Sequence, residues 1–95
     1  MYSVTRLGWT TLMVTDDDER PIDAGLQRKW RSVTGVGFVV PQHEEPHVVA
    51  ISFGEGFNTR EKAAPTMRAM IAELSGSVRY CNVNGQILSE SAWYK

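Results

Sequence analysis

The sequence predicts an α+β fold, in which an antiparallel sheet of four to six strands carries one amphipathic helix, about 58–75, on one face. Two patterns support this class. Short runs of β-branched and aromatic residues alternate with turn signals, as in a sheet of short strands, while only one segment has a long apolar stripe at helical spacing. The pair Asn84 and Gly85, between the strand-like runs 77–83 and 86–93, adds the signal of a tight C-terminal hairpin.

The helix expected at residues 58–75 has the clearest local pattern. Asn58 is the predicted N-cap, Glu61 is placed to bond back to its backbone, and Gly76 suits the left-handed conformation just past the end. Pro65 leaves two starts open, because the helix can begin at Asn58 and bend at Pro65, or begin at Pro65 itself. The stripe expected to face the sheet comprises Ala63, Met67, Met70, Ile71 and Leu74.

The remaining strands are predicted from alternation and turn residues. In residues 2–15 the alternation slips near Gly8, which fits either one bent strand or a short hairpin. Residues 35–40 and 47–53 form a second hairpin pattern, and the strand 47–53 is expected to be central and covered on part of both faces. Residues 22–32 fit both helical and strand spacing, and a short second helix is favoured.

The composition indicates one ordinary globular domain over residues 1–95. Apolar residues make up 42% of the chain and charged residues 22%, close to average usage. Ten basic residues nearly balance eleven acidic ones, so nucleic acid is a weak candidate partner. Cys81 is the only cysteine, which excludes an intramolecular disulfide and fits a reducing compartment. Because no apolar run reaches about 18 residues, we expect a cytoplasmic chain without a membrane span.

The segment 43–47 spells H-E-x-x-H, a pattern that binds zinc when both histidines share one face of a helix. Here Pro41 and Pro46 bracket the motif and strand-like runs flank it, so a helix through all five residues is not expected. We predict a solvated hairpin loop instead.

Two further features that resemble functional sites also have simpler explanations. Residues 54–59 resemble a glycine-rich phosphate loop, but Thr59 stands where the third glycine would be and Glu55 would repel a phosphate. Cys81 has no histidine beside it in the sequence and is expected to be a packed thiol. No catalytic residue, metal ligand or cofactor is therefore predicted.

The candidate protein contacts fall in three segments rich in charged or aromatic residues. They are Trp30 with Arg28, Lys29 and Arg31, the acidic residues Asp16, Asp17, Asp18 and Glu19, and the C-terminal Trp93 and Tyr94. Tryptophan, tyrosine and arginine are enriched at interface hot spots. Each segment has a structural alternative: the aromatic rings can anchor the core, and the acidic run can be a solvated turn.

Since no constellation supports catalysis, we expect a non-enzymatic protein-binding module, a small inhibitor or adaptor that occupies the surface of a partner protein. Phage or mobile-element proteins that block a host complex are one such class. A small-ligand or nucleic-acid binding domain that uses the Arg28–Arg31 patch and the helix N-terminus is the alternative. A small metal- or cysteine-dependent enzyme is a third. Pairing of uncovered strand edges into a homo-oligomer is also left open.

Overall fold

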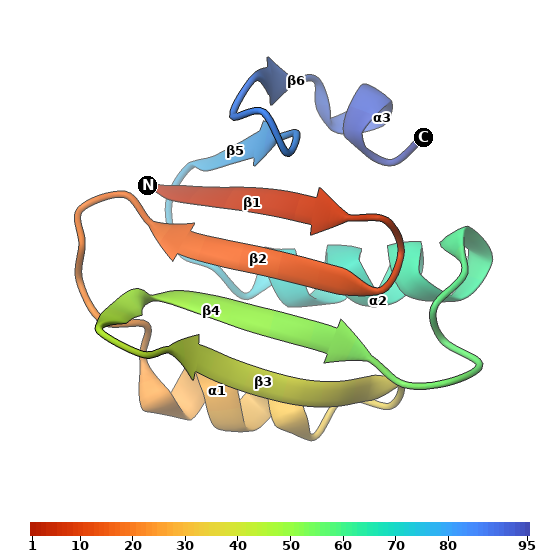
Figure 1. Cartoon of the computed structure of the whole chain (residues 1–95), viewed down its shortest axis with the longest axis horizontal. Coiled ribbons are helices and arrows are strands. Elements are labelled where there is room, and N and C mark those ends of the chain that lie inside the picture. The colour runs from red at the N-terminus through yellow and green to blue at the C-terminus, as the bar shows by residue number, and fades with distance from the viewer.

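A computed structural model describes all of residues 1–95 as a six-stranded sheet with helices on one face (Figure 1). The strands are β1 (Tyr2–Leu7), β2 (Thr11–Asp16), β3 (Val36–Gln42), β4 (Glu45–Phe53), β5 (Val78–Cys81) and β6 (Ile87–Leu88). The helices are α1 (Ala24–Arg31), α2 (Arg60–Ala72) and the short α3 (Glu90–Trp93). The predicted α+β class is confirmed, and so is the second helix within residues 22–32.

The sheet has the strand order β3-β4-β2-β1-β5-β6. Its pairs are antiparallel except for β1 with β5, which are parallel, so the sheet is mixed rather than wholly antiparallel as expected. The reason is the crossover through α2, which returns the chain to the end of the sheet where β4 began. β5 therefore runs in the same direction as β4, and this is also the direction of β1 (Figure 1).

Glycine turns decide two of the hairpins. At Gly8, φ is +60°, and the chain reverses there into the β1–β2 hairpin, so the hairpin alternative for residues 2–15 holds. Gly85, with φ of +80°, closes the predicted C-terminal hairpin between β5 and β6. The second strand of that hairpin ends at Leu88, because the Ser89 side chain then accepts a bond from the Ala92 amide and starts α3.

α2 begins at Arg60, with Thr59 in the N-cap position and no side-chain cap bond. The predicted Asn58 cap is therefore wrong: the first helical amides, those of Lys62 and Ala63, donate to the Thr59 carbonyl. Pro65 lies inside the helix, so the alternative start at Pro65 is wrong as well. The predicted stripe is confirmed, since its five members are buried: Ala63, Met67, Met70, Ile71 and Leu74.

Hydrogen bonds made by side chains hold α1 at its start and near its end. The Asp23 side chain caps its start by accepting a bond from the Leu26 amide. Near its end, the indole N–H of Trp30 donates to the Met70 carbonyl of α2 at 3.2 Å. The two helices thus share one face of the sheet and contact one another across it.

The core lies between these helices and a single face of the sheet. The side chains without any exposed area on the central strands all point to this side: Val4, Leu12, Val14, Val49 and Ile51. β4 lies between β3 and β2, as expected for an inner strand, but no element covers its other face. Val48 and Ala50, on that face, are only half-buried.

Replacing Trp30 with alanine should lower the free energy of unfolding by about 3–5 kcal/mol, because a buried ring is lost together with the bond to Met70. Urea unfolding followed by circular dichroism measures the change. Arg28→Ala, at an exposed position of the same helix, should stay within about 0.5 kcal/mol of the wild-type value. Equal effects from the two variants would contradict the role of Trp30 as the helix anchor.

Candidate functional site

The aromatic contact candidates lie in the core. Trp30, Trp93 and Tyr94 are exposed by only 1%, 2% and 3%. Their rings are therefore not accessible to a partner, so the contact role predicted for them is wrong. The alternative prediction, that these rings anchor the core, is correct for all three. In water, the Trp93 and Tyr94 rings would expose a large apolar area, so packing them against the core is favourable.

The basic residues around Trp30 are largely engaged within the chain. Lys29 pairs with Glu73, the C-cap residue of α2, at 3.1 Å. Arg31 donates to the Val39 carbonyl at 2.7 Å and thereby ties α1 to β3. Among the predicted basic patch, Arg28 alone extends from an exposed position without a hydrogen bond or ion pair. This segment positions α1 more than it presents a charged surface.

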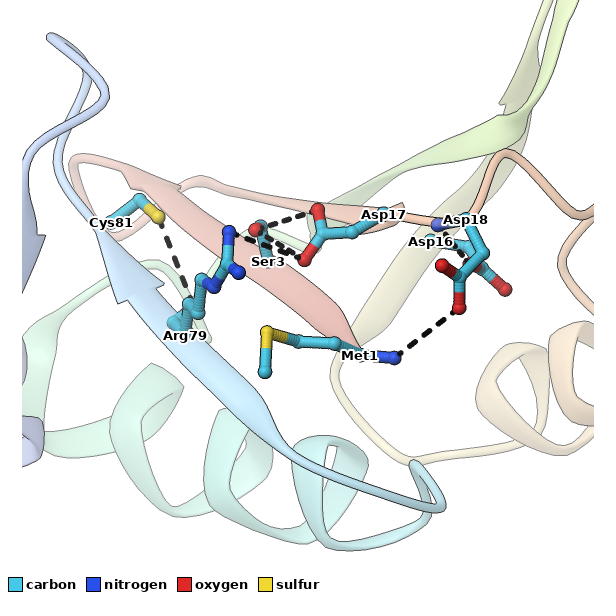
Figure 2. A network of polar contacts seen from close by, with 7 residues as sticks. All are labelled: Met1, Ser3, Asp16, Asp17, Asp18, Arg79 and Cys81. Atoms are coloured by element: carbon cyan, nitrogen blue, oxygen red, sulfur yellow. Dashed lines mark hydrogen bonds and ion pairs between the residues drawn. The ribbon is translucent and has the colours of Figure 1, made fainter.

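The acidic run is also partnered. Asp16 is buried, exposed by 7%, and accepts a bond from the Asp18 amide. Ser3 donates to both carboxylate oxygens of Asp17 at 2.9 and 3.0 Å, and Arg79 approaches the same carboxylate at 4.0 Å (Figure 2). The N-terminal amine lies 3.8 Å from Asp18. These contacts join β1, β5 and the end of β2 at one edge of the molecule, and Glu19 follows in a left-handed turn.

His43 and Glu44 form the β3–β4 turn, while the last three residues of the H-E-x-x-H segment, 45–47, already belong to β4, so the predicted loop is shorter than the motif. Glu44 has φ of +67°, a conformation that a continuous α-helix does not contain. The His43 side chain is 95% exposed. No cluster of three or more metal-ligating side chains occurs in the structure. Cys81 is buried, as expected for a packed thiol.

A cluster of aromatic rings and arginines surrounds α3. The Trp93 ring packs edge-on against Tyr80 at 5.3 Å and against Tyr94 at 4.8 Å. The Trp93 indole N–H donates to the Cys81 carbonyl at 2.9 Å, which fixes α3 on β5. The guanidinium of Arg6 lies 3.8 Å from the centre of the Trp9 ring, an arrangement that adds cation–π attraction. This cluster was not predicted, because it joins distant segments: Arg6 and Trp93, for example, are 87 residues apart along the chain.

The most extended candidate surface is the uncovered side of the sheet, which we call the open face. Its members alternate with the core residues along β1 to β4: Ser3, Thr5, Leu7, Thr11, Met13, Thr15, Phe38, Val40, Val48, Ala50 and Ser52. Phe38 and Val40 are 71% and 48% exposed. They stand two residues apart on β3 and therefore side by side on one face.

Sequence reasoning missed the open face. The run Gly35–Val40 was assigned to a strand, but a run that is apolar at nearly every position does not show which side is covered. The pairing of Phe38 with Ser52 and of Val39 with Ile51 separates the exposed from the buried set. That information exists only once β3 and β4 are in register.

Comparisons with protein-family models, with curated proteins and with solved structures find no match to this chain. None of its helices combines the length and the apolar character needed to cross a membrane.

Replacing Tyr94 with phenylalanine should leave the free energy of unfolding at neutral pH unchanged or raise it by about 1 kcal/mol. The reason is that the Tyr94 hydroxyl is buried without a hydrogen-bond partner, and such a group costs stability. Urea unfolding at neutral pH measures the difference. A loss of several kcal/mol would mean that the hydroxyl has a partner.

The same variant, Tyr94→Phe, should also change how the free energy of unfolding depends on pH under alkaline conditions. Burial, together with the nearby Tyr80, raises the pKa of Tyr94 above its ordinary value of 10.0. The unfolded chain then ionises first, so the contribution of Tyr94 is complete below pH 10 and falls as the pH rises above that value. Tyr94→Phe should therefore lose less stability than wild type in urea unfolding above pH 10. Tyr2→Phe, the control, should decline like wild type.

Proposed function

We propose that this chain is a non-enzymatic protein-binding module, an inhibitor or adaptor that covers part of a partner protein with the open face of its sheet. The observation that carries this proposal is the exposure of Phe38 and Val40 next to each other on that face. The apolar strip continues through Ala50, paired with Val40, and Met13, paired with Ala50. Contiguous exposed apolar surface is typical of contact sites in soluble proteins.

The charge of the open face favours a protein over a nucleic acid. None of its members on β1 to β4 is charged. Affinity for DNA or RNA depends strongly on lysine and arginine side chains that neutralise phosphates. A surface of methyl, hydroxyl and aromatic groups instead matches an uncharged, largely apolar protein surface, since burying it against charges would leave them unpaired.

The edge of the sheet is a poorer contact than its face. β3 is the outer strand, and its pairing with β4 shifts register on both sides of the segment 38–41. Pro41 lacks an amide N–H, and irregular or proline-containing edge strands resist the addition of another strand. We therefore propose contact through the face, with the Phe38 ring inserted into the partner.

The proposal is tested by capturing partners of the tagged chain from an extract of its native host, in wild-type form and as the double variant Phe38→Thr with Val40→Thr. The native host is chosen because inhibitors of the phage or mobile-element type act on host proteins. Reducing conditions suit the cytoplasmic location that we propose for a chain with one free cysteine. A stoichiometric partner should be retained by the wild type and lost with the double variant.

Threonine keeps the β-propensity of the two positions, so the fold should be preserved. The matched control is Val83→Thr, which alters an equally exposed apolar residue, 64% exposed, in the β5–β6 turn. The control should retain the partner. Retention by all three chains, or failure of the wild type to retain any protein, would contradict the proposal. Self-association of the wild type that the double variant abolishes would show a second copy on this face instead.

A further inference from the structure

Three cavities open on the surface, and one of them brings two arginine side chains together. The largest, about 330 Å³, is lined by Lys29 and Glu73, which already pair with each other. The smallest, about 190 Å³, is lined mostly by apolar side chains. The third, about 230 Å³, runs along the flank of α2 beside the C-terminal segment and is lined by Arg60, Glu61, Ala64, Pro65, Arg68 and Tyr94. We call it the arginine cleft.

Both arginines of this cleft are held in place without an acidic partner. Arg60 donates through Nε to the Tyr94 carbonyl at 3.0 Å. The Arg68 guanidinium lies 4.1 Å from the centre of the Tyr94 ring. Neither residue takes part in any of the four ion pairs of the structure. Tyr94 therefore positions both guanidinium groups, through its carbonyl and its ring, and neither group makes an ion pair.

The positive charge near the cleft is reinforced by a third arginine. Burial, and next the proximity of Arg60, lower the pKa of Arg6 below its ordinary value. Arg6 is itself held by the Trp93 and Gly8 carbonyls, at 3.2 and 2.8 Å, and makes no ion pair. Arg6 lines a different cavity, but like charges that are close together repel, so Arg6 adds to the positive potential at Arg60.

We propose that the arginine cleft binds a small-molecule oxyanion, a carboxylate or a phosphate group, between Arg60 and Arg68. The guanidinium fork presents N–H groups in a plane that matches both kinds of oxyanion. The Tyr94 ring supports the Arg68 guanidinium from below, because the ring is almost fully buried against it.

The remaining lining limits the size and charge of the ligand. A volume of about 230 Å³ is below the range of roughly 300–1,000 Å³ usual for larger ligands, so the cleft suits a small molecule. Glu61 adds one negative charge to the lining, which disfavours a polyanion.

The test is a titration of the ¹⁵N-labelled full chain with sodium phosphate and, separately, with sodium acetate, at constant ionic strength. Amide shifts should concentrate in residues 60–68 and 93–95 and should saturate. The stronger of the two anions identifies the ligand group as phosphate or carboxylate. Arg60→Gln and Arg68→Gln should each weaken binding by about tenfold or more, because each removes one charge-assisted donor.

Arg20→Gln is the matched control, since it removes one exposed positive charge that does not line the cleft and takes part in none of the ion pairs. It should leave the affinity unchanged. The amide spectrum of each variant checks that it is folded. Non-saturating shifts, shifts spread over all basic segments, or equal weakening in Arg20→Gln would overturn the proposal. The open face lies on the other side of the sheet, so either proposal can fail without the other.

Discussion

The bond from the Trp30 indole to the Met70 carbonyl joins the two helices that cover one face of the sheet. Because both helices pack on the same side, every fully buried strand residue points toward them, and the opposite face has no layer of its own. A domain of this size has one core, and placing it on one side leaves a whole sheet surface in contact with water. The open face and its exposed Phe38 follow from this one-sided packing.

The same packing separates the chemistry of the molecule into distinct regions. Along β1 to β4 the open face carries no charged side chain, while the arginines around the C-terminal segment lie on the helix side and are held by backbone carbonyls and aromatic rings. The acidic run lies at the opposite ends of β1 and β2, where Asp17 meets Ser3 and Arg79 (Figure 2). A net charge of −1 therefore conceals local excesses of both signs. Composition alone reports only their sum.

The sequence predicted the elements better than the site. The stripe from Ala63 to Leu74 and the turn at Gly85 were recognised because both depend on neighbours a few residues apart. The sequence also predicted partner contacts for Trp30, Trp93 and Tyr94, which are buried in the structure. Residue type alone does not show which aromatic side chains are buried in the core and which are exposed. The Asn58 cap is wrong by one residue, since the Thr59 carbonyl accepts the first helical bonds although the Thr59 side chain makes no cap bond.

By itself, the amino-acid sequence determined the α+β class, the place of α2 and the C-terminal hairpin at Gly85, because helical periodicity and glycine conformation act over a few residues. The tertiary structure alone decided that β5 pairs in parallel with β1, that Phe38 faces water and that Arg60 and Arg68 meet at Tyr94. These features depend on strand register and on contacts between distant segments. They are stabilised by apolar area that two or more distant segments bury against each other, so the sequence of one segment cannot predict them.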